Sequence, residues 1–126
     1  MRKKTKKSNL SKLHTPPDSP DIKQKQQKKE IDFIIKRLYV YLKTHPGCIF
    51  LKKISGSCVG YYDDAEETIT IDYRCDFVPT LIHEFIHHMR PKWNEKMVIR
   101  EEKKVMKHLT GIQCRNILRA MVGSLY

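Results

Sequence analysis

Residues 81–88 read Leu-Ile-His-Glu-Phe-Ile-His-His and contain the pattern His-Glu-x-x-His. On an α-helix, His83 and His87 lie four residues apart, so both imidazoles project from one face and can bind one ion. Glu84 follows the first histidine, where its carboxylate can take a proton from water at the open position of a metal. The apolar residues between these polar groups predict a buried helix that spans residues 77–89. The pattern therefore predicts a zinc-binding helix; the alternative is an amphipathic helix with histidines on its surface.

A catalytic zinc site needs a third protein ligand, and the next segment carries the candidates. Asn94 is of a type that caps helices, and the apolar spacing after it predicts a helix that carries Glu95, Glu101 and Glu102. At 100° per residue, Glu102 falls about 40° from Val98 inside the apolar stripe, and Glu101 falls about 60° away on the other side. We therefore favour Glu102 as the third ligand, with Glu101 as its rival. The alternative is that both acids belong to a solvated face and pair with nearby lysines.

The rest of the chain predicts a small α+β domain over residues 30–126. Apolar residues at helical spacing from about Glu30 predict an N-terminal helix, which the sequence His-Pro-Gly at 45–47 ends. Three short strands should follow as an antiparallel meander, then the metal helix and one or two C-terminal helices with a break at Gly111. The expected strands cover residues 49–54, 58–62 and 68–73.

Residues 1–29 differ sharply in composition from the rest of the chain. They consist mainly of Lys, Gln, Ser and Pro, with too few apolar residues to offset the entropy lost on ordering, so we expect a disordered tail. The tail holds ten Lys or Arg against two Asp, which accounts for +8 of the formal net charge of +11. Weak contact of the tail with nucleic acid or another acidic partner is therefore an open alternative. The tail lacks the interleaved aromatic residues on which bases stack.

Several broad classes of protein are disfavoured. No stretch reaches the roughly 18 apolar residues of a membrane span, and the basic N-terminus is not followed by the apolar core of a secretory signal. We therefore expect no membrane partner and an intracellular location, cytoplasmic or, in a eukaryotic host, nuclear. The chain contains no Cys-x-x-Cys pair, so the cysteines should be reduced. A chain of 126 residues suits one small domain, which we expect to be monomeric. The four cysteines are Cys48, Cys58, Cys75 and Cys114.

The strand at 68–73, the His-Glu-x-x-His helix and the acidic helix at 94–109 together resemble a zincin metallopeptidase, specifically a pared-down gluzincin. The resemblance covers about residues 50–110. It implies that the strand at 68–73 holds an extended substrate. A metzincin or a SprT-like protease would add a third histidine soon after the helix, and this chain has none before His108. Larger gluzincins also have a second subdomain, for which this chain is too short. The implied ligands of Zn²⁺ are His83, His87 and Glu102, with Glu101 as the rival, and the implied general base is Glu84.

The activity that the resemblance implies is hydrolysis of peptide bonds in a peptide or protein substrate. Water activated by zinc would attack the bond, with Glu84 as the general base. The alternative is a zinc-stabilised binding module without catalysis, tethered to nucleic acid by its basic tail. An open coordination position would separate a catalytic site from a structural one.

Overall fold

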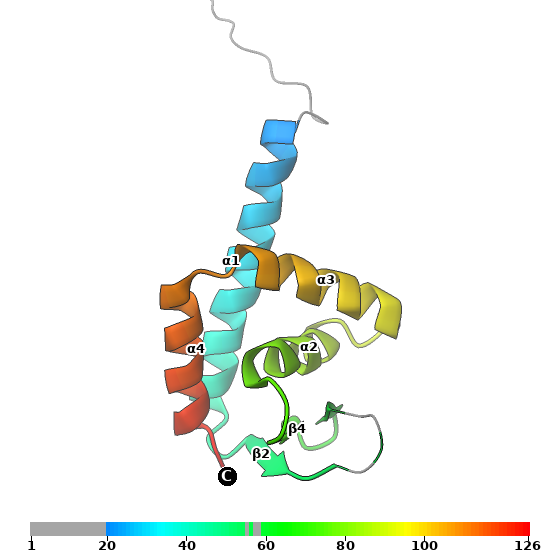
Figure 1. The fold of residues 1–126 in the computed structure, drawn as a ribbon, viewed down its shortest axis with the longest axis vertical. Helices are drawn as coiled ribbons and strands as arrows, with labels where there is room; N and C mark the ends of the chain where they lie inside the picture. The colour runs from blue at the N-terminus through cyan, green and yellow to red at the C-terminus, as the bar shows by residue number, and fades with distance from the viewer. Residues whose placement is uncertain (1–19, 55, 57–58) are drawn as a thin grey trace, which may run out of the picture. The chain divides into compact units, whose positions relative to one another are not determined.

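The computed structural model describes residues 20–54, 56 and 59–126, which form four helices and a three-stranded sheet. This confirms the predicted α+β class. Figure 1 labels most of these elements. The metal helix has the predicted bounds, and a break between the last two helices also occurs where the sequence predicts it. In chain order the elements are α1 (Pro20–Thr44), β2 (Ile49–Lys52), β3 (Gly60–Asp63), β4 (Thr68–Asp72), α2 (Phe77–Met89), α3 (Glu95–His108) and α4 (Gly111–Gly123).

Helix α1 begins earlier than the sequence predicts. It starts at Pro20 instead of near Glu30, which corrects the expectation of disorder for residues 20–29. Proline is well suited to the first turn of a helix, and the Lys and Gln residues that follow are strong helix formers, so the polar segment can extend the apolar one. The chain divides into two compact units, Met1–Asp32 and Phe33–Tyr126. All the strands and helices α2 to α4 belong to the second unit, and the rest of the predicted tail lies outside the described residues.

The sheet is mixed and does not form the predicted antiparallel meander. Its strand order is β2-β4-β3, with β2 parallel to β4 and β3 antiparallel to β4. Strand β4 has the clearest alternation in the sequence, and four of its five residues are buried, so it takes the centre. Since β4 is paired on both sides, it cannot offer a free edge to a substrate, which corrects that implication of the resemblance. Strand β3 is an edge strand, because it pairs with β4 alone among the described strands.

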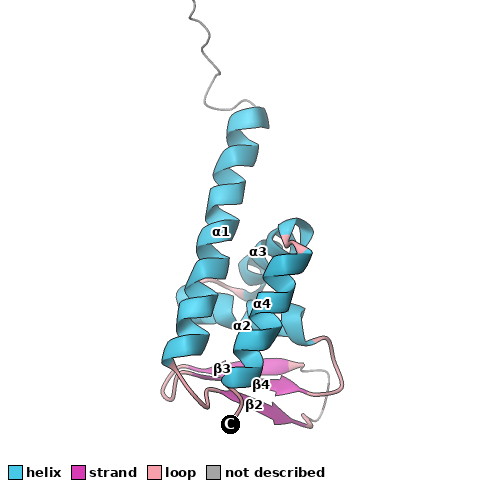
Figure 2. Ribbon diagram, turned by 90° about the vertical axis from the view of Figure 1, so that its left-hand side faces the viewer, coloured by secondary structure: helices cyan, strands magenta, loops and turns pink. Residues whose placement is uncertain are grey.

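The helices of the second unit lie on one side of the sheet, as Figure 2 shows. Helix α2 packs against β3 and β4 on one side and against α3 and α4 on the other. Its apolar residues Leu81, Ile82, Phe85 and Ile86 are at most 1% exposed, so α2 is the central helix of the core. Asn94 caps α3 as predicted, by accepting a hydrogen bond from the backbone of Met97. A reciprocal pair of cap hydrogen bonds between Thr110 and Gln113 starts α4 and explains the break before it.

Two further expectations can be compared with the described residues. Cys48, Cys75 and Cys114 are free, as predicted, whereas Cys58 lies outside the described part of the chain. No described helix is both long enough and apolar enough to cross a membrane.

Gly60 allows β3 to lie close against α2. A Cβ atom at this position would come within 2.7 Å of the Thr80 side chain and 2.8 Å of the Thr70 carbonyl oxygen. It would also lie 3.6 Å from Cγ of Glu84. The missing side chain therefore sets the separation between the edge strand and the part of α2 that carries Glu84.

We expect Gly60→Ala to destabilise the fold by about 1–3 kcal/mol, because the added methyl group overpacks the contact between β3 and α2. The matched control is Gly111→Ala at the first position of α4, where a Cβ would meet no atom within 4 Å. That change should be neutral or stabilise by up to about 1 kcal/mol. Urea denaturation of both variants measures the difference; equal stability would show that the close approach imposes no constraint.

Candidate metal centre

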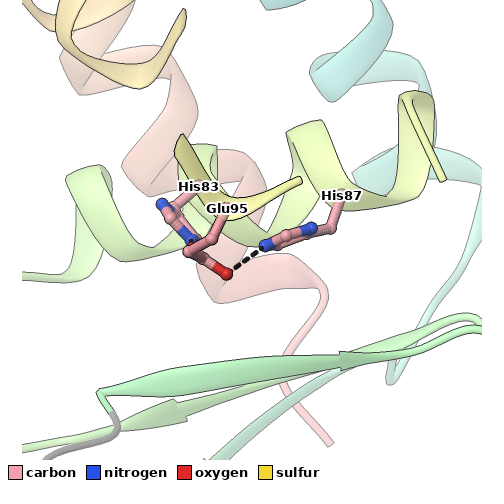
Figure 3. A group of neighbouring side chains, drawn as sticks. All are labelled: His83, His87 and Glu95. Atoms are coloured by element: carbon pink, nitrogen blue, oxygen red, sulfur yellow. Dashed lines mark ion pairs between the residues drawn. The ribbon is translucent and has the colours of Figure 1, made fainter. Parts of the chain in front are cut away.

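Three side chains converge at the junction of α2 and α3, as Figure 3 shows. His83 and His87 come from α2, and Glu95 is the first residue of α3. One potential ligand atom from each lies within 4.8 Å of the others. One carboxylate oxygen of Glu95 contacts Nε2 of His83, and the other lies 3.2 Å from Nε2 of His87. The predicted pairing of the two histidines across one helical turn is therefore present, with a carboxylate between them.

The third group differs from the one favoured by the sequence. Glu102 is not a member of this group; its Oε1 lies 2.8 Å from Nδ1, the other ring nitrogen of His83. Glu101, the predicted rival, points elsewhere, and its carboxylate lies 3.9 Å from the Lys104 ammonium. The structure thus places Glu95 where the sequence analysis expected Glu102, and Glu102 where it can orient His83.

The spacing of the two carboxylates on α3 explains why helical phase alone favoured Glu102. Glu95 and Glu102 are seven residues apart, so they lie within about 20° of each other around the helix and about 10 Å apart along it. Both face α2, and only the crossing of the two helices decides which one reaches the Nε2 atoms. The sequence signal for this arrangement is therefore the pair of acids two turns apart on α3. Such a pair can place one carboxylate at each ring nitrogen of a single histidine on the neighbouring helix.

The set of donors matches what zinc prefers in proteins. Two imidazole nitrogens and one carboxylate oxygen form the ligand set of many catalytic zinc sites, which leave a fourth position open. Metal on Nε2 of His83 would keep the ring proton on Nδ1, where it can be donated to Glu102. Burial lowers the pKa of His83, but the hydrogen bond to Glu102 and the charges of the surrounding carboxylates outweigh burial and raise its pKa overall. The residues therefore fit a divalent cation, which would take the place of a proton.

Glu84 lies beside this group but does not belong to it. It is only 5% exposed, and among the described residues no donor gives its carboxylate a hydrogen bond. Burial is the largest cause that raises its pKa, to about 7, with the charges of Glu95 and Glu102 acting in the same direction and His83 opposing them. A carboxyl group with such a pKa can both accept and release a proton near neutral pH.

The three side chains of the candidate metal group line one open cleft of about 950 Å³, together with Glu84 and Glu102. Helix α2 and the start of α3 form one part of its lining, and the edge strand β3 forms another. The residues that line it are Val59, Gly60, Tyr61, Tyr62, Asp64, Pro79, Thr80, His83, Glu84, His87, Pro91, Glu95 and Glu102.

Comparison of the chain with protein-family models found no match, and no curated protein or solved structure matches it either.

We expect Glu95→Gln to weaken zinc binding more than Glu102→Gln does, because the first removes a ligand and the second only a partner of a ligand. Loss of such a partner typically costs about 10–100-fold in metal affinity. Glu101→Gln is the matched control on the same helix and should bind zinc like the wild type. Competition with a chromophoric chelator gives the three affinities. If Glu102→Gln abolishes binding while Glu95→Gln preserves it, Glu102 is the ligand after all.

The buried carboxyl of Glu84 should make the stability of the metal-free protein depend on pH. Its pKa rises from an ordinary value of 4.5 to about 7 on folding, so the folded state holds an extra proton between these values. Its contribution to stability is complete below about pH 4.5 and is lost as the pH rises through 7. Metal-free Glu84→Gln should therefore become more stable than the wild type above pH 7, by up to about 3 kcal/mol.

Urea denaturation of metal-free protein at pH 5 and pH 8 measures this effect. Glu66→Gln, which changes an exposed acid outside the cleft, is the control and should show no such difference. Equal stability of Glu84→Gln and the wild type at pH 8 would contradict the burial argument.

Proposed function

We propose that this chain is a zinc-dependent peptidase that hydrolyses peptide bonds with Glu84 as the general base. The observation that carries the proposal is a buried carboxylate, without a hydrogen-bond donor among the described residues, beside three side chains that could hold a metal ion in one open cleft. A side chain such as Glu84 costs stability when it is buried without a hydrogen bond, so its presence calls for a function. Proton transfer to and from a reacting group is a function that its pKa suits.

In this proposal, His83, His87 and Glu95 hold the cation, and Glu102 fixes the ring of His83. Zinc bound there would polarise the scissile carbonyl and lower the pKa of a bound water molecule from about 15.7 to about 7. Glu84 takes a proton from the attacking water and passes it to the leaving amine.

The edge of β3 supports a peptide as the substrate. An extended segment can add to a sheet edge through main-chain hydrogen bonds, which do not depend on its sequence. Strand β3 is the edge strand that lines the cleft, and Gly60 brings it close to Glu84. A peptide laid along β3 would therefore pass the cation and the general base.

A binding module with a purely structural zinc ion is the competing function. Structural zinc sites are closed by four protein ligands. In the described part of the chain, the metal-ligating group has three members, and the side chain of Glu95 is 62% exposed. An open cleft with an accessible ligand favours the catalytic interpretation.

Glu84→Gln should reduce peptide hydrolysis by at least about 10²–10⁴-fold, because it removes the proton acceptor while keeping the shape of the side chain. Zinc content should remain that of the wild type, since Glu84 is not a ligand in this proposal. The assay is cleavage of an unstructured peptide library at equal zinc occupancy, with Glu101→Gln as an active control. Cleavage by Glu84→Gln at the wild-type rate would contradict the mechanism, and a wild type that cleaves nothing would favour the binding module.

A further inference from the structure

We infer that the cleft selects extended peptides that carry a lysine or arginine side chain near the scissile bond, and that Asp64 recognises this positive charge. This inference rests on the proposed function, since it assigns a substrate class to the same cleft. Three observations support it: the charge of the cleft lining, the path of β3, and the exposure of Asp64 without an ion pair in the described ranges.

The cleft is acidic in a basic protein. Among the described residues, its lining contains four carboxylates and neither lysine nor arginine, although the chain as a whole has a formal net charge of +11. The basic residues of α3 therefore lie outside the cleft, which concentrates negative potential where a substrate would bind. The four acids are Asp64, Glu84, Glu95 and Glu102.

A bound cation does not reverse the sign of this charge. Zinc contributes two positive charges against the four carboxylates, so the loaded cleft keeps about two negative charges, or one when Glu84 is protonated. In the proposed site Glu95 binds the cation, and Glu102 is engaged by Nδ1 of His83. Asp64 is then the carboxylate available to a side chain of the substrate.

The path of β3 places Asp64 beyond the reacting groups. Gly60 lies against Glu84, and the hydroxyl group of Tyr62 lies 2.6 Å from Nδ1 of His88, near the end of α2. The strand therefore runs past the metal-binding turn of α2, and Asp64 follows its last residue. A peptide along β3 with its scissile bond at the cation would bring a side chain two or three residues away to Asp64, since strands rise about 3.3 Å per residue.

Asp64 differs from the other acids of its turn. Asp63 accepts hydrogen bonds from the backbone N–H groups of Ala65 and Glu66, and Glu67 pairs with His45 at 3.0 Å. Asp64 is exposed, lines the cleft, and forms no ion pair with any residue in the described ranges. It is therefore free to pair with an ammonium or guanidinium group of a ligand.

The test uses zinc-loaded full-length protein and internally quenched peptides. Each peptide varies one position, which is any of the three residues on either side of the cleaved bond. The varied residue is Lys, Gln or Glu. At one position, kcat/KM should follow Lys above Gln above Glu, with about a two- to fivefold advantage of Lys over Gln, the effect of an exposed ion pair. The advantage should shrink at high salt. Asp64→Asn should remove it and Asp64→Lys should reverse it. Glu66→Gln, an exposed acid of the same turn outside the cleft, should preserve it.

A second measurement separates this inference from the proposed function. Zinc-loaded Glu84→Gln, with and without Asp64→Asn, is titrated with the same peptides, and fluorescence anisotropy gives Kd. The inference is supported if the Lys peptide binds more tightly than the Gln peptide and Asp64→Asn abolishes this difference. This holds even if the wild type cleaves nothing, and in that case only the proposed hydrolysis fails. Cleavage without charge preference, or binding that Asp64→Asn leaves unchanged, would overturn the inference while hydrolysis by the wild type would stand.

Discussion

Both ring nitrogens of His83 are held by carboxylates of one helix, and the rest of the site depends on this contact between α2 and α3. Glu95 reaches Nε2 and Glu102 lies 2.8 Å from Nδ1, so the imidazole has little freedom to rotate. The two acids can do this because they lie two turns apart on α3. The packing of α2 against α3 in the core thus fixes the side chains that could hold a metal ion.

The sequence predicts α2 fully, because all the information for this helix is local. The apolar spacing and the two histidines one turn apart act within a few residues, and α2 has the predicted bounds. The cap of the next helix, Asn94, is an equally local signal and is also present. The sheet order and the start of α1 were predicted wrongly for opposite reasons. Pairing of β2 with β4 is a nonlocal choice, whereas residues 20–29 follow a local helix propensity that their polar composition obscured.

The third member of the candidate metal group depends on tertiary structure and not on helical phase. Rotation about the helix axis places Glu95 and Glu102 within about 20° of each other, so an angular argument cannot separate them. Translation along the axis separates them, but it depends on the crossing of α2 and α3, which arises from side-chain packing across the whole interface. A pattern can therefore predict the kind of ligand and the helix that supplies it, and only tertiary structure can select the residue.

Glu84 connects the stability of this fold with its chemistry. The residue is 5% exposed and lies on the side of α2 that faces β3, the edge strand that Gly60 brings near. Burial without a hydrogen bond favours the neutral acid, so the same packing that costs stability at high pH raises the pKa to about 7. In the proposed function, this pKa lets the carboxyl group exchange a proton with a substrate in the adjacent cleft near neutral pH.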